Sequence, residues 1–172
     1  IEIQQLEFRW PRQNKATLCI DRFEVERGER IFLKGESGSG KSTLLSLLGG
    51  VLTPQSGRIR LLGQCINQMP GSQRDRFRAD HIGFIFQMFN LIPYLSVVEN
   101  VLLPLQFSRL RRDRVMQNGT VNAEAQRLLT HLGLGAADWN RPVTELSVGQ
   151  QQRVAAARAL LGRPELVIAD EP

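Results

Sequence analysis

Lysine, cysteine and long apolar runs are scarce in this sequence. The few cysteines argue against a disulfide-rich protein, and the short apolar runs argue against a membrane-spanning one. Only three of the 22 basic residues are lysines, so the net charge of +5 comes almost wholly from arginine. Cys19 and Cys65 have no close spacing, which favours buried free thiols in a reducing compartment over a disulfide framework. The longest apolar run, residues 44–52, is interrupted by a serine and two glycines and is too short to span a membrane. No signal-peptide pattern, internal repeat or low-complexity segment appears.

The arginines are scattered along the chain, apart from one local cluster. A basic balance can indicate a nucleic acid or an anionic membrane surface as partner. For the cluster we expect a solvated face, with a contact to phospholipid or to a partner protein as the alternative. Its members are Arg109, Arg111, Arg112 and Arg114.

What is present is an ordinary globular composition with patterns of both strands and helices. A chain of 172 residues, 42% hydrophobic and 23% charged, suits one domain with a sizeable core. The last strand expected is a continuous apolar run, as in a parallel strand covered on both faces. Strands are expected near 1–8, 18–20 with 23–26, 30–34, 58–62, 64–66, 82–86 and 166–169, and helices near 42–48, 72–80, 123–132 and 147–161.

Residues 35–43 contain the pattern G-x-x-x-x-G-K-S, a phosphate-binding loop. Its glycines let the backbone approach phosphates closely, and amide N–H groups at a helix N-terminus bind anions. Lys41 is expected to contact the β- and γ-phosphates of ATP, and the Ser42 hydroxyl to coordinate Mg²⁺. An accidental Gly/Ser-rich turn is disfavoured by the apolar run before the loop and the leucine-bearing segment after it. The loop residues expected to bind nucleotide are Gly35, Ser37, Gly38, Ser39, Gly40, Lys41, Ser42 and Thr43.

Two carboxylates, Asp170 and Glu171, follow the apolar strand 166–169. In open α/β sheets ligands bind at the carboxyl ends of the strands. Asp170 can hold the Mg²⁺ that Ser42 also contacts, and Glu171 can orient or deprotonate the water that attacks the γ-phosphorus. A strand that simply ends in charged residues is the alternative. Because the phosphate loop is also present, we expect loop and carboxylates to act on the same ATP.

The run 146–160, LSVGQQQRVAAARAL, carries the most specific signal. It opens a helix with a serine and a glycine, which is a second place for an anion; an ordinary N-cap followed by a tightly packed alanine face is the alternative. The run resembles the signature of the ATP-binding cassette (ABC) family, L-S-G-G-Q followed by Q-R-V-A-x-A-R-A-L. The resemblance covers essentially all 172 residues, and the three motifs in this order are specific to that family.

The resemblance implies a pair of such domains facing head to tail, as a homodimer or with a second ABC ATPase domain. ATP then lies between one phosphate loop and the other subunit's signature, where Ser147, Gly149 and Gln150 would bind the γ-phosphate. Gln87 matches the family's glutamine that contacts Mg²⁺ and water and links the site to the transmembrane partner. Trp10 matches the aromatic that stacks on adenine, although tyrosine is usual there. A polar strand-end residue and an edge-strand aromatic covering the core are the respective alternatives.

Two features depart from the family pattern. Val148 stands at the signature's first glycine, and a β-branched residue resists positive φ. Either the backbone needs no glycine geometry there, which we favour, or the site across the dimer is weakened. The family's aspartate-containing loop and switch histidine follow the acidic pair, whereas this chain ends at Pro172 and begins at Ile1 rather than at a methionine. We therefore expect a fragment that binds nucleotide better than it hydrolyses it.

The fold that the resemblance implies is α/β: a P-loop NTPase core with a mixed or parallel sheet, an N-terminal antiparallel β portion and an α-helical signature subdomain. The expected organisation is a single ABC ATP-binding domain, 1–172, truncated at the C-terminus. Residues 1–87 and 162–172 would form the nucleotide-binding core, and 88–161 the helical subdomain.

Within the family, residues 82–101 resemble ATPases that serve lipoprotein release, macrolide export and related permeases. This implies an ATP-hydrolysing subunit, peripheral on the cytoplasmic face of the inner membrane, that powers export or lipoprotein translocation through separate integral membrane permease subunits. The apolar residues between Met88 and Leu105 would dock a permease helix or be buried within the domain. A soluble ABC ATPase of nucleic acid or ribosomes is the alternative. Only the basic charge supports it, and we expect no nucleic-acid partner.

Overall fold

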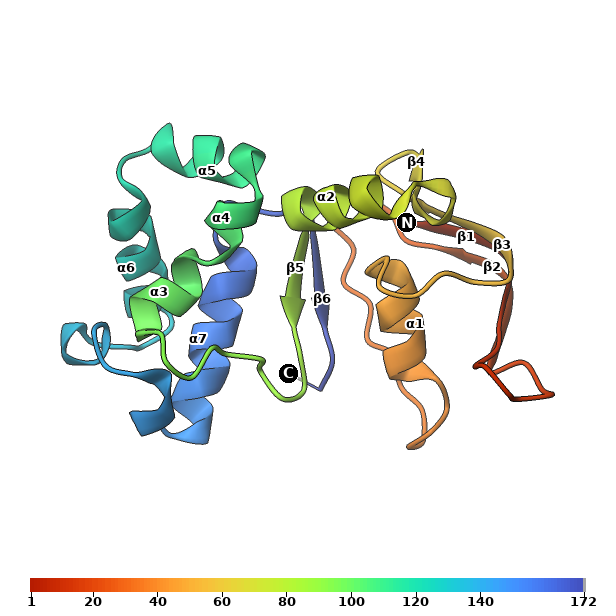
Figure 1. Ribbon diagram of the computed structural model, residues 1–172, viewed down its shortest axis with the longest axis horizontal. Helices are drawn as coiled ribbons and strands as arrows, with labels where there is room; N and C mark the ends of the chain where they lie inside the picture. The colour runs from red at the N-terminus through yellow and green to blue at the C-terminus, as the bar shows by residue number, and fades with distance from the viewer. Residues whose placement is uncertain (172) are drawn as a thin grey trace. The chain divides into compact units, whose positions relative to one another are not determined.

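A computed structural model describes residues 1–171, and Pro172, on which the expectation of a truncated end falls, lies outside the described residues. The chain divides into two compact units, Ile1–Asp75 and Arg76–Pro172. Figure 1 labels their helices and strands. None of the helices in residues 1–171 is both long and apolar enough to cross a bilayer.

The first unit is built on an antiparallel sheet of four strands in the order β2-β1-β3-β4. Ile3 of the central strand pairs with Phe23 on one side and with Ile59 on the other. Alternate residues of the strands therefore reach a core that also contains Leu47 of the helix after the phosphate loop. The elements are β1 (Glu2–Phe8), β2 (Leu18–Glu24), α1 (Lys41–Leu48), β3 (Ser56–Leu61), β4 (Gln64–Cys65), the short 3₁₀ turn η1 (Ile66–Gln68) and the start of α2 (Gly71–His81).

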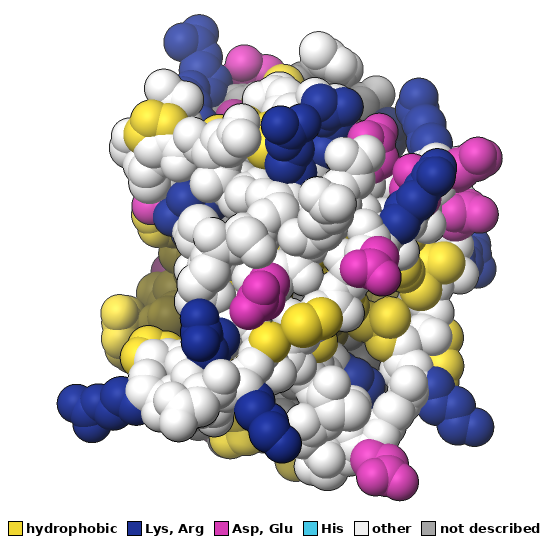
Figure 2. Space-filling model, turned by 90° about the vertical axis from the view of Figure 1, so that its right-hand side faces the viewer, with side chains coloured by type: hydrophobic (Ala, Val, Ile, Leu, Met, Phe, Trp, Pro, Cys, Tyr) yellow, Lys and Arg dark blue, Asp and Glu magenta, His cyan; other side chains and the backbone are white. Residues whose placement is uncertain are grey.

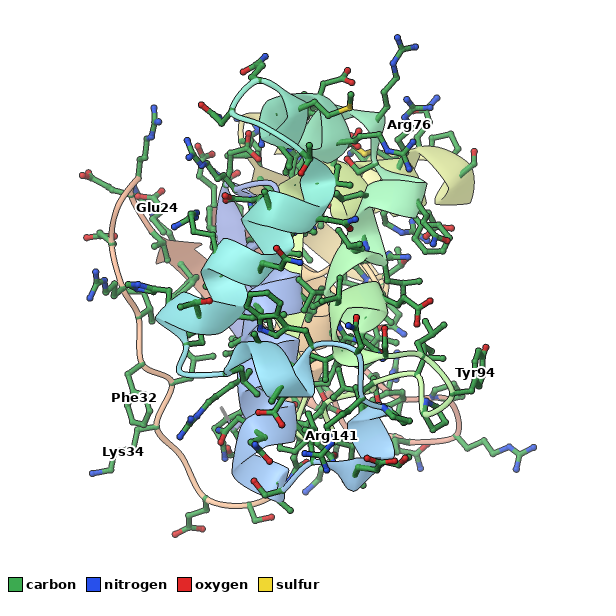
Figure 3. The ribbon with its side chains drawn as sticks, turned by 90° about the vertical axis from the view of Figure 1, so that its left-hand side faces the viewer. Glu24, Phe32, Lys34, Arg76, Tyr94 and Arg141 are labelled. Carbon is green, nitrogen blue, oxygen red and sulfur yellow. The ribbon has the colours of Figure 1, made fainter. Side chains whose placement is uncertain are left out.

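The strand expected over residues 30–34 is wrong. This segment is not a strand, and Phe32 within it is 88% exposed (Figure 3). A strand requires a neighbouring strand to receive its N–H and C=O hydrogen bonds, and none of the strands in residues 1–171 pairs with this segment. The apolar pattern alone could not reveal that the partner is missing.

The cysteine expectation is also wrong in part. Both thiols are free, but Cys19 is exposed and Cys65 is half-buried. Cys19 lies on β2, an edge strand of the sheet, and pairs with Glu7. It therefore faces the solvent side of the sheet.

The second unit combines a parallel pair of strands with a group of helices. β5 (Ile82–Ile85) and β6 (Leu166–Ala169) run parallel, and α7 packs on β5. At Gly83 a Cβ would lie 2.2 Å from the carbonyl oxygen of Ala159, so only glycine allows this close approach. The helices are α3 (Val97–Leu102), α4 (Pro104–Phe107), α5 (Arg109–Met116), α6 (Val121–His131) and α7 (Val148–Leu160), with the 3₁₀ turns η2 (Ala136–Asp138) and η3 (Val143–Glu145).

The apolar segment after β5 divides between core and surface. Val97, Val101 and Leu105 are buried in a cluster with residues of α6 and α7, so the burial alternative is right for them. Met88 and Tyr94 are 82% and 84% exposed, and Tyr94 points away from the protein in Figure 3.

The expectation that the last strand is covered on both faces is wrong. Val167 is 42% exposed, so β6 is not covered on both faces. β5 is its sheet neighbour within residues 1–171, which leaves Val167 without cover.

The solvated arginine face is wrong at Arg111, which is 2% exposed. Its guanidinium donates to the carbonyl oxygens of Leu161 and Ala159 at the end of α7, and its Nε lies 2.7 Å from the Leu161 oxygen. Burial, followed by the nearby charge of Arg114, lowers the pKa of Arg111 to about 10. Arg109 and Arg112 are exposed as expected.

Candidate functional site

The phosphate loop leads into α1 through two left-handed glycines, and Lys41 is the first residue of that helix. Gly38 and Gly40 have φ of 80° and 95°, a left-handed conformation that favours glycine. None of the described side chains caps the N-terminus of α1, so Gly40 leads directly into the helix. The ammonium of Lys41 turns back to the carbonyl oxygens of Gly35 and Glu36, at 2.8 and 2.9 Å, and ties the loop together.

The end of this loop packs against the β1–β2 hairpin. A Cβ on Gly40 would lie 2.8 Å from the Leu18 side chain of β2. Leu18 pairs with Phe8, whose ring meets that of Trp10 edge to face at 5.2 Å. Trp10 is 39% exposed and thus presents an aromatic surface from the same hairpin. The edge-to-face contact agrees equally with the alternative that Trp10 is an edge-strand aromatic that covers the core. Stacking of Trp10 on adenine therefore stays a prediction.

The carboxyl ends of β5 and β6 bring Gln87 and Glu171 together. The Asp170 N–H donates to the Ile85 carbonyl oxygen at 2.9 Å and continues the parallel pairing past the strand ends. Gln87 Nε2 then donates to Glu171 Oε2 at 2.7 Å, across 84 residues of sequence. Glu171 has a φ of 50°, which is uncommon for a residue with a side chain. Two site residues predicted from separate motifs therefore meet.

The signature residues form the N-terminus of α7. Ser147 caps the helix in a reciprocal box with Gln150: the Gln150 N–H donates to Ser147 Oγ at 3.3 Å, and the Ser147 N–H to Gln150 Oε1 at 2.9 Å. Nothing lies within 4 Å of a Cβ built on Gly149. In the part of the chain that the structure describes, no hydrogen bond links these residues to Gln87 or Glu171.

Val148 occupies the first turn of α7 and does not have a positive φ. The interpretation that the backbone needs no glycine geometry at this position therefore agrees with the structure.

One residue of the same run was missed by the sequence reasoning. Arg158 of α7 is 8% exposed, and its guanidinium donates to the carbonyl oxygens of Phe89 and Asn90 at 2.5 and 2.7 Å. These two residues follow Gln87 closely. The only signal in the sequence was an arginine within an otherwise apolar helix face.

The residues present fit a nucleoside triphosphate with magnesium. The two left-handed glycines and the helix start they lead into suit phosphate oxygens. In the first unit Ser42 offers a hydroxyl oxygen, and in the second Gln87 and Asp170 offer amide and carboxylate oxygens; oxygen donors of these kinds are those that Mg²⁺ prefers.

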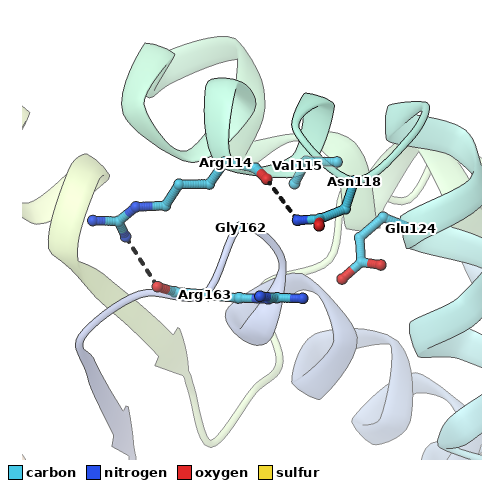
Figure 4. A pocket seen from close by; sticks show the side chains of 6 residues that line it. All are labelled: Arg114, Val115, Asn118, Glu124, Gly162 and Arg163. Carbon is cyan, nitrogen blue, oxygen red and sulfur yellow. Dashed lines mark hydrogen bonds between the residues drawn. The ribbon is translucent and has the colours of Figure 1, made fainter.

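A small pocket of the second unit lies elsewhere (Figure 4). It is lined by Arg114, Val115, Asn118, Glu124, Gly162 and Arg163, none of which is a predicted site residue. Two hydrogen bonds join its lining residues: Arg114 donates to the Arg163 carbonyl oxygen at 3.0 Å, and Asn118 to the Arg114 carbonyl oxygen at 3.4 Å. Glu124 pairs with Arg127 outside the pocket.

Comparison with known proteins decides the family. The profile described as "ABC transporter" matches residues 20–172. This chain belongs to the ABC transporter family. The resemblance inferred from the phosphate loop, the signature and the acidic pair is confirmed.

Several curated ABC proteins are similar to this chain. An uncharacterized ABC transporter ATP-binding protein of Escherichia coli, YbbA, is 49% identical over 86% of this chain and 62% of its own length. A lipoprotein-releasing system ATP-binding protein, LolD 2 of Rhodospirillum rubrum, is 45% identical over 87% of this chain and 62% of its own length. The macrolide export protein MacB of Syntrophobacter fumaroxidans is 47% identical over 87% of this chain and 20% of its own length. The chain thus spans under two thirds of these ABC relatives.

Solved ABC cassettes share the fold. The dimeric structure of the bacterial ABC transporter cassette MJ0796 matches with a TM-score of 0.85 and 33% identity, over 99% of this chain and 73% of that one. A dimeric post-hydrolysis state of MJ0796 bound to ADP and Pi matches with a TM-score of 0.83, 33% identity and the same coverage. The expected α/β P-loop NTPase fold is therefore confirmed.

Proposed function

We propose that this chain is part of an ATPase subunit that binds and hydrolyses ATP to drive a separate membrane permease in export or lipoprotein release. The observation that carries the proposal is the 2.7 Å hydrogen bond between Gln87 and Glu171. It joins the glutamine expected to respond to the permease to the carboxylate expected to act on water. The ABC relatives named for lipoprotein release and macrolide export support the direction of the proposal.

The phosphate loop is proposed to bind the triphosphate. The backbone N–H groups at the start of α1 would donate to phosphate oxygens, and Lys41 would exchange the carbonyls of Gly35 and Glu36 for the β- and γ-phosphates. That exchange places a fixed positive charge where negative charge develops in the reaction. Trp10 is proposed to stack on the base.

The acidic pair and Gln87 are proposed to act on metal and water. Magnesium, when bound with the nucleotide, neutralises phosphate charge, and Ser42, Gln87 and Asp170 would hold it. Glu171 would orient the attacking water and take its proton. Since Gln87 already donates to the Glu171 carboxylate, it fixes which oxygen of that carboxylate is left for the water.

The signature is proposed to act on a nucleotide held by a second ABC domain. Gly149 needs no glycine geometry, and a Cβ built on it would have open space around it. The open space there would suit a phosphate from outside, and Ser147 and Gln150, which now donate their N–H groups to each other's side chains, would exchange these bonds for the phosphate. The dimeric cassettes among the solved relatives support this pairing.

The permease contact is proposed to lie at the exposed apolar side chains that follow Gln87, Met88 and Tyr94. Docking there would place the chain at the cytoplasmic face of the inner membrane and would connect permease movement to the Gln87–Glu171 pair. Figure 2 shows basic side chains scattered among acidic ones on the face it displays, which gives no support to a nucleic-acid surface.

Two substitutions in the complete protein test the proposal. Lys41→Ala should weaken ATP binding by about tenfold to a hundredfold, because a charge-assisted contact to phosphate is lost. Glu171→Gln should keep ATP binding but lower turnover by at least about a hundredfold, because a general base is lost. Binding is measured by calorimetry and turnover by phosphate release. Lys34→Ala, an exposed lysine just before the loop, is the control and should change neither.

Wild-type turnover in Glu171→Gln would refute the role of Glu171, and unchanged ATP binding in Lys41→Ala would refute that of the loop. Phosphate release by the 172-residue chain itself tests the separate prediction that it binds nucleotide better than it hydrolyses it. Salt-dependent binding of DNA or ribosomes by the complete protein would favour the nucleic-acid alternative.

A further inference from the structure

The turn after β5 holds Phe89 in a left-handed conformation that an aromatic residue disfavours, whereas the following Asn90 tolerates it. Phe89 and Asn90 have φ of 56° and 48°, and two consecutive residues with side chains rarely adopt the left-handed region. The Phe89 N–H donates to the Phe86 carbonyl oxygen at 2.9 Å, and the Asn90 N–H to that of Met88 at 2.6 Å. Such a turn persists only when its surroundings impose it.

Arg158 is the group that imposes it. Its guanidinium reaches both carbonyl oxygens of the turn, Asn90 at 2.7 Å and Phe89 at 2.5 Å. The side chain is 8% exposed, burial lowers its pKa, and none of the ion pairs found among residues 1–171 joins Arg158 to a carboxylate. A buried cation without a counter-ion is costly, so these two carbonyls are the main compensation for its charge. Turn and arginine therefore depend on each other.

The conformation of this turn determines the position of the Gln87 side chain. Only Met88 separates Gln87 from Phe89, and Gln87 donates to Glu171 at 2.7 Å. A change in the φ of Phe89 would rotate the preceding backbone and move the amide away from the carboxylate. Arg158 lies eleven residues after Ser147 on α7, roughly 16 Å along the helix. One rigid element thus carries both the signature and the arginine that holds this turn.

We propose that Arg158 is a positioning residue for Gln87: by binding the carbonyls of Phe89 and Asn90 it keeps Gln87 on Glu171 and ties that contact to the signature helix. The inference rests on the proposed function, because it gives Gln87 and Glu171 their catalytic roles. Arg158 itself is not among the residues proposed to bind nucleotide or metal.

The test compares Arg158→Lys and Arg158→Gln with Arg111→Lys in the complete protein with its permease. Lysine keeps the charge and glutamine keeps a donor, but neither can bind two carbonyls as the planar guanidinium does. Arg111 is the matched control, since it is also a buried arginine bound to backbone carbonyls. Its partners are the carbonyls at the end of α7, those of Leu161 and Ala159 and, at 3.5 Å, that of Arg158, rather than those of the turn. Each variant is made with and without Gln87→Ala.

The expected result is a loss of kcat by about tenfold to a hundredfold in the Arg158 variants. KM for ATP should stay within about twofold, and melting temperature should fall no further than in Arg111→Lys. In the Gln87→Ala background the Arg158 substitutions should cause no further loss, because the group they position is already absent.

Additive losses in the two backgrounds, or equal losses of kcat in Arg111→Lys, would overturn the positioning role of Arg158 alone. Wild-type turnover in Gln87→Ala would instead contradict the proposed role of Gln87, and the inference with it. Should neither Arg158 variant fold, amide exchange in the wild-type protein decides. Protection of the Phe89 and Asn90 amides comparable to that of β5 supports the inference, and exchange as fast as in an open loop overturns it.

Discussion

Val148 and Gly149 share the first turn of α7, and the chain itself requires a glycine at neither position. Neither has a positive φ, so the helix would accept other residues at both positions. Val148 is 72% exposed and has little contact with its own chain. The departure from the family's signature at this position is thus tolerated by the backbone, for a reason that the sequence alone left open.

Val148→Gly should therefore change little. A substitution on the surface of a helix start alters the free energy of unfolding by about 0.5 kcal/mol or less. We expect ATP turnover of the complete protein to stay within about twofold, which corresponds to a similar energy. Urea unfolding and phosphate release measure the two quantities. A tenfold gain of turnover would mean instead that the valine obstructs the second domain. Gly149→Val is the matched comparison, and there we expect a marked loss of turnover without loss of stability.

The elements that the sequence predicted well are those whose signals are local. α7 starts at the serine and ends before the Gly162 turn, as expected from its cap and stop residues, and β6 lies where the apolar run predicted it. The segment 30–34 and the exposure of Arg111 in α5 were misjudged because both depend on distant groups. A strand needs a partner, and Arg111 is buried because the carbonyls that end α7 need donors.

The same limit applies to the site. The phosphate loop, the acidic pair and the signature could be found because each is a pattern of neighbouring residues. The meeting of Gln87 with Glu171 was not derivable from spacing, since 84 residues separate them. Arg158 was missed because its role comes from two backbone carbonyls of another segment, and backbone groups carry no sequence signal.

Glu165 joins three elements through a pH-dependent contact. It stands just before β6, and its carboxylate binds Arg114 of α5 at 2.5 Å and His81 at the end of α2 at 3.0 Å. Partial burial opposes its ionisation, but the hydrogen bonds from Arg114 and His81 outweigh that effect and lower the pKa of Glu165 to about 2.

Because the pKa of Glu165 is lower in the folded protein, its carboxylate stabilises the fold at pH values above 4.5, the pKa in the unfolded chain. This stabilisation is lost as the pH falls towards 2, the pKa in the folded protein. Glu165→Gln should cost about 1 kcal/mol at pH 7, after allowance for its partial exposure to solvent. At pH 2 the variant and the wild type should unfold alike. Urea titrations at both pH values measure this. Glu145→Gln, at an exposed pair with Arg141, is the control and should show a smaller effect. A difference that persists at pH 2 would mean that the effect is not due to the ionised carboxylate.

At the scale of the whole molecule, charge and apolar surface point to different kinds of partner. The net charge of +5 is spread over many arginines, and some of them, such as Arg111 and Arg158, are buried and serve the fold. The exposed apolar side chains are fewer, and two of the most exposed, Met88 and Tyr94, follow Gln87 within seven residues. A protein partner at these side chains explains them better than a nucleic acid does.

Tyr94→Ala should accordingly separate partner binding from ATP binding. An exposed aromatic at the centre of an interface contributes about 2 kcal/mol or more, so we expect the complete protein to bind its permease at least about tenfold more weakly. ATP affinity should not change, because Tyr94 lies outside the phosphate loop and the signature. Co-purification with the permease in detergent and calorimetry with ATP measure the two effects.

Met116→Ala is the matched control: this apolar residue is 61% exposed at the end of α5, away from the segment after Gln87, and its loss should affect neither. Equal weakening by both substitutions would point to general surface hydrophobicity rather than a docking site at Tyr94, and full permease binding by Tyr94→Ala would place the contact elsewhere on the chain.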